Sequence, residues 1–139
     1  MNIWIVEDVA ANIDGVRDIV EAVFKDYPGG SVLTTNDSIV WPKGTRKDEY
    51  PDIVVLDIMY GETEPRGQVF YEELRRKEDP TKGALVIVWS GYTGNKQVEA
   101  FLKKESGCGR FFRVEKSEEL LRLKLEGVRE KLLEKREVR

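Results

Sequence analysis

Hydrophobic residues in this chain gather in five short runs separated by longer stretches in which apolar and polar residues mix. Three of the runs are apolar at nearly every position, which is typical of strands covered on both faces of a sheet. We expect strands at Ile3–Val6, Ser31–Thr35, Asp52–Asp57, Ala84–Trp89 and Arg110–Val114. The runs are short and evenly spaced, so the chain is predicted to contain a sheet rather than a helical bundle.

The stretches between the runs repeat their apolar residues at helical spacing, as Ile13, Val16 and Val20 do. We expect helices at about Ala10–Asp26, Gln68–Lys77 and Lys96–Lys104, and from an N-cap at Ser117 to near the C-terminus. Residues 36–51 are different, because Pro42 and Gly44 prevent a long helix there. This segment is predicted to be a long loop with at most a turn or two of helix.

Strands that alternate with helices predict an α/β fold. The expected architecture is a doubly wound, five-stranded parallel sheet with helices on both faces, of the flavodoxin-like type. A length of 139 residues suits one domain. We expect a single domain over residues 1–139, with its core in residues 1 to about 130 and a last helix that extends toward the C-terminus.

The last helix carries a regular apolar stripe formed by Leu121, Leu125, Val128 and Leu132. The first half of this stripe is predicted to pack on the sheet. Beyond Val128 two interpretations stay open. The remaining turns either pair with a second subunit as a short coiled coil, giving a homodimer, or form a frayed tail.

Composition narrows the possible functions. The net charge of −3 provides no basic field for nucleic acid, and no apolar run approaches the ~20 residues of a membrane span. The N-terminus lacks the features of a secretory signal, so we expect a cytoplasmic protein. Cys108 is the only cysteine, which rules out an internal disulfide. The chain has no histidine, so any metal must be a hard cation held by oxygen, in practice Mg²⁺, Mn²⁺ or Ca²⁺.

Polar residues stand where the predicted strands end. Glu7 and Asp8 follow the first strand, Asp57 ends the third, Ser90 ends the fourth and Lys116 follows the fifth. The carboxyl ends of parallel strands lie at one edge of the sheet, where ligands bind in such folds. We therefore expect three carboxylates, one hydroxyl and one ammonium to meet there.

This set of groups suits phosphoryl transfer. Like charges at ~4 Å repel by several kcal/mol at a partly buried site, and a divalent cation relieves that repulsion. Oxygen ligands favour Mg²⁺, with Mn²⁺ as an alternative. A carboxylate beside the cation can attack phosphorus and form an aspartyl phosphate. The lysine and the hydroxyl can then stabilise charge on the phosphoryl oxygens.

Four segments together resemble the receiver domain of response regulators in two-component signalling. They are Val6-Glu7-Asp8, the stretch from Pro51 to Met59, Val88-Trp89-Ser90-Gly91 and Glu115-Lys116-Ser117. The resemblance covers residues 1 to about 130. It implies that Asp57 is the phosphoacceptor. It also implies that Asp8 binds Mg²⁺ directly, that Glu7 binds it through water and that Met59 binds it through its backbone carbonyl.

The same resemblance implies that Ser90 hydrogen-bonds the phosphoryl group and that Lys116 pairs with it. The donor would be a histidine kinase or a phosphotransfer protein, and output would pass by protein–protein contact to a partner that the sequence does not identify. Such a domain is not an enzyme in the usual sense, although it catalyses its own phosphorylation and slow dephosphorylation.

Two positions depart from the family pattern. Ser117 stands where the family usually has proline, and Arg113 stands where it has a switch aromatic. Phe112, one residue earlier, is expected to point to the opposite face unless a bulge intervenes. Arg113 is expected to be a surface residue rather than a relay. These departures motivate one alternative, an atypical receiver that binds partners without phosphorylation.

A second alternative is a phosphohydrolase with an aspartate nucleophile. Such enzymes normally have an acid two residues after the nucleophile, where this chain has Met59.

Overall fold

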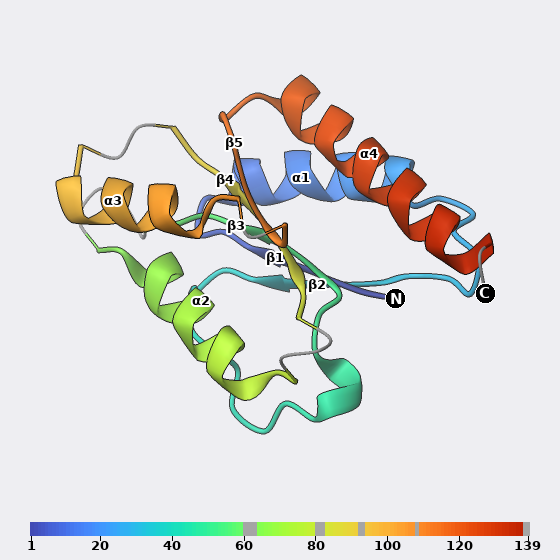
Figure 1. Ribbon diagram of the computed structural model, residues 1–139, viewed down its shortest axis with the longest axis horizontal. Helices are drawn as coiled ribbons and strands as arrows, with labels where there is room; N and C mark the ends of the chain where they lie inside the picture. Colours follow the sequence, from blue (N-terminus) through green and yellow to red (C-terminus); the bar gives the residue numbers. More distant parts are fainter. Residues whose placement is uncertain (60–63, 80–82, 92–93, 108, 138–139) are drawn as a thin grey trace.

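The computed structural model describes residues 1–59, 64–79, 83–91, 94–107 and 109–137. Strands and helices alternate along these residues, as Figure 1 shows. The strands are β1 (Asn2–Val6), β2 (Val32–Asn36), β3 (Ile53–Leu56), β4 (Leu85–Trp89) and β5 (Phe111–Val114). The helices are α1 (Ala10–Val23), the short 3₁₀ helix η1 (Lys47–Glu49), α2 (Arg66–Lys77), α3 (Lys96–Glu105) and α4 (Glu118–Glu137). Cys108 lies outside the described residues.

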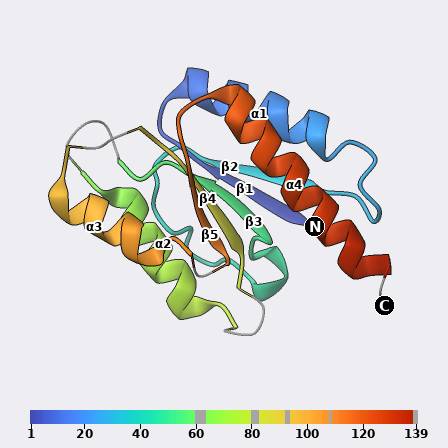
Figure 2. The same cartoon turned by 45° about the horizontal axis from the view of Figure 1, so that its top comes forward.

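The five strands form one parallel sheet in the order β2-β1-β3-β4-β5. Helices α1 and α4 lie side by side on one face, and α2 and α3 cover the other (Figures 1 and 2). The sheet thus separates two apolar cores. The doubly wound α/β architecture predicted from the sequence is confirmed, and so are its five strands.

The predicted element boundaries match the structure at several ends and differ from it by one to three residues at the others. Helix α1 ends at Val23 rather than Asp26, because the chain turns at Asp26, whose φ is 60°. Helix α2 begins at Arg66, two residues earlier than expected, and β2 is shifted by one residue. Helix α3 ends at Glu105, and Gly107, directly after the C-cap residue Ser106, has a φ of 98°, a conformation that favours glycine.

Residues 37–52 form a loop with one 3₁₀ turn, as predicted, and aromatic rings take the place of a helix there. Trp41 packs against Trp4 of β1, Phe70 of α2 and Tyr50, with ring centroids 5.4–5.6 Å away. The preceding turn is organised by Asn36, whose side-chain amide donates to the carbonyl of residue 40 at 2.7 Å and whose Oδ1 accepts from the backbone N–H groups of residues 38 and 39. Contacts between aromatic rings thus cover this part of the sheet, where a helix is absent.

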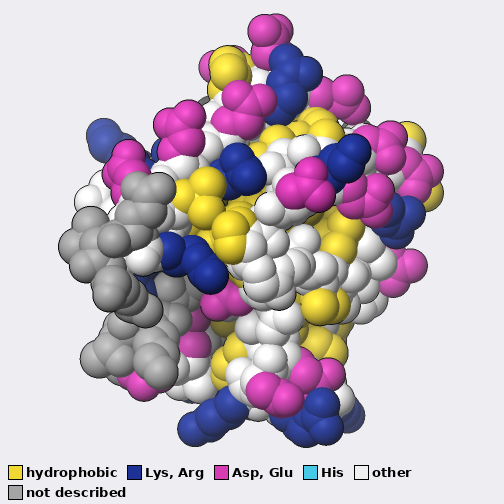
Figure 3. Space-filling view, turned by 90° about the vertical axis from the view of Figure 1, so that its right-hand side faces the viewer, with side chains coloured by type: hydrophobic (Ala, Val, Ile, Leu, Met, Phe, Trp, Pro, Cys, Tyr) yellow, Lys and Arg dark blue, Asp and Glu magenta, His cyan; other side chains and the backbone are white. Residues whose placement is uncertain are grey.

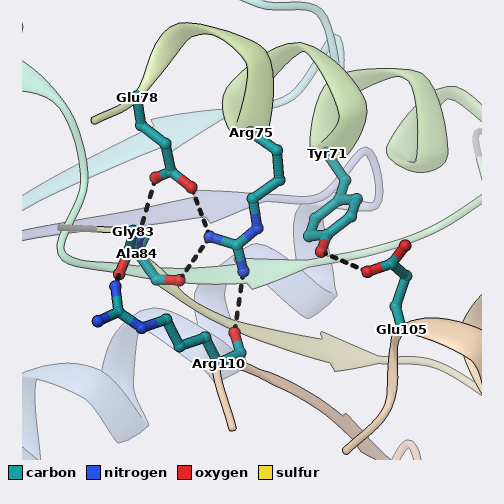
Figure 4. Close-up of polar contacts among 7 residues, drawn as sticks. All are labelled: Tyr71, Arg75, Glu78, Gly83, Ala84, Glu105 and Arg110. Atoms are coloured by element: carbon teal, nitrogen blue, oxygen red, sulfur yellow. Dashed lines mark hydrogen bonds and ion pairs between the residues drawn. The ribbon is translucent and has the colours of Figure 1, made fainter. Parts of the chain in front are cut away.

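A partly buried arginine, Arg75, ties the amino ends of two strands to α2 (Figure 4). Arg75 donates to Glu78 at 2.6 Å, to the carbonyl of Ala84 at 2.9 Å and to the carbonyl of Arg110 at 3.1 Å. Glu78 in turn accepts from the backbone N–H of Ala84 at 2.9 Å. These bonds join the end of α2 to the starts of β4 and β5, at the edge opposite the strand ends that carry the predicted site.

Helix α4 buries the first half of its apolar stripe as predicted, and the later turns also contact the domain. Leu121, Leu125 and Val128 are in the core between α1 and the sheet, and Leu132 and Leu133 pack partly against it. The helix therefore keeps contact with the domain from Leu121 to Leu133, about three and a half turns. In the described part of the chain, no helix is long and apolar enough to cross a membrane.

Acidic and basic side chains are interspersed on the face shown in Figure 3, with hydrophobic side chains between them. That face has no broad field of positive charge, in agreement with the small negative net charge.

Replacing Trp41 by alanine should destabilise the domain, because three ring contacts are lost together. We expect a loss of about 2–4 kcal/mol in the free energy of unfolding. The neighbouring Val40 is 54% exposed, so Val40→Ala should cost less than about 0.5 kcal/mol. Urea denaturation of both variants checks this, and equal midpoints for the two would show that the rings do not hold the loop.

Candidate functional site

Three acidic side chains meet at the carboxyl edge of the sheet. Glu7 and Asp8 directly follow β1, and Asp57 directly follows β3, the central strand beside it. One carboxylate oxygen of each lies within 4.8 Å of the others. The convergence predicted from the strand ends is therefore confirmed for these three residues.

Glu7 is held in place by its own segment and by Lys116. It is only 2% exposed, and its Oε1 accepts from the backbone N–H of Val9 at 3.2 Å and from Asn12 Nδ2 at 3.3 Å. Lys116 Nζ lies 3.7 Å from Glu7 Oε2. The ammonium predicted from the end of β5 thus reaches the acidic cluster, where it offsets part of the negative charge.

Asp57 is 8% exposed, and the backbone N–H of Met59 donates to its Oδ1 at 3.4 Å. Burial, followed by the nearby charge of Glu7, raises the pKa of Asp57 from 3.8 to about 8, against the opposing effect of Lys116. A carboxyl group in this setting needs an added positive charge to ionise fully near neutral pH. A cation bound beside Asp57 would favour the ionised form of this carboxyl group.

Ser90 lies at the end of β4 and is 5% exposed. Its backbone N–H donates to the carbonyl of Val114 at 3.2 Å, but its hydroxyl has no hydrogen-bond partner among the described residues. Buried hydroxyl groups are normally hydrogen-bonded, so an unpartnered one is a candidate for binding a ligand. Lys116 Nζ also sits 5.3 Å from the ring centroid of Trp89, the residue before Ser90.

The donor set fits a hard divalent cation. Carboxylate oxygens are the ligands that Mg²⁺ prefers, and three of them stand within reach of one ion. Two unit charges at 4 Å repel by about 4 kcal/mol at an effective dielectric constant of ~20, which a divalent ion would reverse. Glu7, Asp8 and Asp57 are the residues that would hold it. The roles assigned to water and to the Met59 carbonyl remain predictions.

The structure shows how the chain is arranged at Arg113 and Ser117, the two positions near the end of β5 that depart from the family pattern. The β4–β5 register is regular, without a bulge, so Phe112 faces α4, where Lys124 Nζ lies 3.5 Å from its ring centroid. Arg113 points to the other face and bonds with Glu99 of α3 and with the carbonyl of Gly91. Arg113 is exposed, as expected of a surface residue, but its side chain is also held by Glu99 and by the carbonyl of Gly91. The described residues contain no cis peptide bond, so Lys116 and Ser117 are joined in trans.

The fold of this chain is also found in a solved structure. The signal receiver domain of a DNA-binding response regulator from Colwellia psychrerythraea 34H superposes with a TM-score of 0.61 over 96% of this chain and 98% of its own length, at 18% sequence identity. The chain has the receiver fold. A bacteriophytochrome response regulator, RtBRR, aligns over 91% of this chain and 77% of its own length, with a TM-score of 0.49 and 13% identity. No protein-family model and no curated protein matches the sequence.

Two residues that support the site were not identified from the sequence. Asn12 reaches Glu7 from the first turn of α1. Gly67, in the first turn of α2, lies so close to the Asp57–Ile58 backbone that an added Cβ would be 2.2 Å from the Asp57 carbonyl oxygen. Its N–H also donates to the carbonyl of Ile58 at 2.9 Å. A lone glycine in a loop-like sequence gives no sign of such a close approach.

Replacing Asp57 by asparagine should stabilise the domain in the absence of divalent cations, and more so at higher pH. The pKa of Asp57 is raised in the folded state, so the folded wild type binds more protons than the unfolded chain between about pH 4 and pH 8 and loses stability across that window. Each pKa unit corresponds to about 1.4 kcal/mol. The advantage of Asp57→Asn should exceed that amount at about pH 8 and shrink toward about pH 5.

Urea denaturation at several pH values, with and without Mg²⁺, measures this effect. Mg²⁺ should stabilise the wild type and have little effect on Asp57→Asn. Asp14→Asn makes the same charge change at a side chain that is 73% exposed, so its stability should follow that of the wild type. Parallel pH curves for wild type and Asp57→Asn would contradict the expectation.

Gly67→Ala should destabilise the domain by about 1–3 kcal/mol, because the added methyl group meets backbone atoms that cannot move away cheaply. Gly127 of α4 offers a matched control, since an added Cβ there meets nothing within 4 Å. Gly127→Ala should stabilise the protein by roughly 0.5–1 kcal/mol through helix propensity. Thermal unfolding of both variants tests this, and a Gly67→Ala domain as stable as Gly127→Ala would refute the close packing.

Proposed function

We propose that this chain is a phosphorylation-dependent signalling switch that accepts a phosphoryl group on Asp57. The observation that carries the proposal is the cluster of Glu7, Asp8 and Asp57, with Lys116 beside it. The buried hydroxyl of Ser90, which has no hydrogen-bond partner in the described part of the chain, follows the neighbouring strand β4. A structural role would not require three carboxylates to crowd one edge of the sheet. The receiver fold is consistent with the same reaction.

The proposed reaction moves a phosphoryl group from a phosphohistidine to Asp57. A carboxylate oxygen of Asp57 attacks phosphorus, the P–O bond forms as the P–N bond breaks, and the released imidazole nitrogen keeps the electron pair and takes up a proton. Mg²⁺ bound by the acidic cluster would neutralise charge on the transferring oxygens. Mn²⁺ offers the same chemistry.

The protein's own groups would act on the phosphoryl oxygens. Lys116 pairs with Glu7 in the structure, and it would shift part of that interaction to the phosphoryl group once negative charge arrives on Asp57. Ser90 would donate a hydrogen bond from its hydroxyl to another phosphoryl oxygen, a partner that none of the described residues supplies. The contacts of both residues would thereby depend on whether Asp57 is phosphorylated.

The partners follow from this chemistry. The donor would be a histidine kinase or a phosphotransfer protein in the cytoplasm, and the phosphorylated form would bind a downstream protein. Asp57 is a reactant that is regenerated only by slow hydrolysis, so the domain is a switch rather than an enzyme acting on an external substrate.

Incubation with Mg²⁺ and acetyl phosphate tests the proposal. Intact-mass spectrometry should show a gain of one phosphoryl group in the wild type, reversed by hydroxylamine, which cleaves acyl phosphates. Asp57→Asn should show no gain. Asp14→Asn, which removes an exposed acid from α1, should react like the wild type.

Two results would contradict the proposal in different ways. Absence of any Asp57-dependent gain would favour the atypical receiver that signals without phosphate, an alternative motivated by Arg113 and Ser117. Repeated turnover of a phosphate ester would favour the phosphohydrolase, which the apolar Met59 two residues after Asp57 argues against.

A further inference from the structure

Arg113 connects the strand end that carries Ser90 to helix α3. Its Nη2 donates to the carbonyl of Gly91, the residue after Ser90, at 2.9 Å and to Glu99 Oε1 at 2.9 Å. Its Nη1 bonds with the other carboxylate oxygen of Glu99. A single guanidinium group therefore holds a loop carbonyl and a helix side chain at once.

The backbone around Ser90 is tied to β5 at two consecutive points. The N–H of Ser90 bonds with the carbonyl of Val114, and the carbonyl of Gly91 bonds with the Arg113 side chain. Between these two bonds lies the buried Ser90 hydroxyl, for which the described residues provide no hydrogen-bond partner. A ligand that engages the Ser90 hydroxyl would pull on a short piece of backbone whose next carbonyl is an acceptor for Arg113.

Glu99 lies in the first turn of α3, whose N-cap is Asn95. The forked, two-oxygen contact fixes the orientation of the carboxylate as well as its distance. Both side chains remain partly accessible, with 31% of Arg113 and 17% of Glu99 exposed. Because water can reach both side chains, this pair can rearrange at a lower cost than a fully buried pair.

Resting on the function proposed above, we propose that Arg113 is a positioning residue that couples the Ser90–Gly91 backbone to helix α3 through Glu99. When the Ser90 hydroxyl turns to a phosphoryl group on Asp57, the Gly91 carbonyl moves relative to Arg113, and the Arg113–Glu99 pair passes that movement to the start of α3. The state of Asp57 thus reaches the surface formed by α3 and β5 through a polar link.

Hydrogen exchange of the full chain tests this link. Backbone amides are followed in Mg²⁺ alone and in Mg²⁺ with beryllium fluoride, a mimic of the aspartyl phosphate. In the wild type, beryllium fluoride should change exchange both around Asp57 and Ser90 and in α3, the latter by about fivefold or more, as expected for a coupled site. In Arg113→Ala and in Glu99→Gln the change at the site should persist, whereas the change in α3 should fall below about twofold.

Two further variants separate coupling from a merely structural effect. Arg113→Lys keeps the charge but lacks the planar fork that holds Gly91 and Glu99 together, so it should recover only part of the α3 response. Arg110→Ala removes another β5-region arginine, which donates to the carbonyl of Gly83 at 2.8 Å near the opposite end of the strand. That variant should keep the full α3 response.

The outcomes distinguish this proposal from the function on which it rests. If beryllium fluoride changes nothing around Asp57 in the wild type, the phosphorylation switch itself fails. If the site responds but α3 does not, or if α3 responds equally in wild type, Arg113→Ala and Glu99→Gln, the site functions and the Arg113 link is wrong.

Discussion

The mutual repulsion of three carboxylates at one edge of the sheet is the constraint on which the rest of this structure depends. Glu7, Asp8 and Asp57 are brought together by the backbone of β1 and β3, and a single lysine offsets their charge only in part. Burial then raises the pKa of Asp57 to about 8, the reverse of what a paired surface acid shows. Strongly shifted pKa values of this kind cluster at functional sites, which makes this edge of the sheet the candidate site.

The scaffold withstands that repulsion because its rigidity comes from elsewhere. Two apolar cores pack against the two faces of the sheet. At the edge opposite the site, Arg75 joins α2 to β4 and β5 by hydrogen bonds. The loop over residues 37–52, which connects β2 to β3, contains no α-helix, yet the strands that carry the site keep their order. There the rings around Trp41 cover the sheet without a helix, while the strands that carry the acids, Ser90 and Lys116 keep their order.

Strand patterns and strand ends were sufficient to predict the fold and the convergence of the acids. A buried parallel strand appears in the sequence as a continuous apolar run. The first polar residue after that run therefore lies at the edge of the sheet where the strands end. Contacts between distant segments were beyond this reasoning. Gly67 approaches Asp57 only because α2 starts two residues earlier than its sequence suggests, and Glu99 meets Arg113 only after α3 docks on the sheet. Neither residue has a local pattern that marks it.

Two arginine–glutamate pairs show how the same chemistry serves opposite ends of the sheet. At the amino edge, the Glu78 side chain is 8% exposed and Arg75 also binds two backbone carbonyls. Breaking that pair would leave the Glu78 carboxylate largely buried without its opposite charge. At the carboxyl edge, Arg113 and Glu99 remain in contact with water, and solvent can replace either partner. Strain introduced at Asp57 would therefore be relieved where the ion pair is easily rearranged, toward α3, rather than where it is locked, at the end of α2.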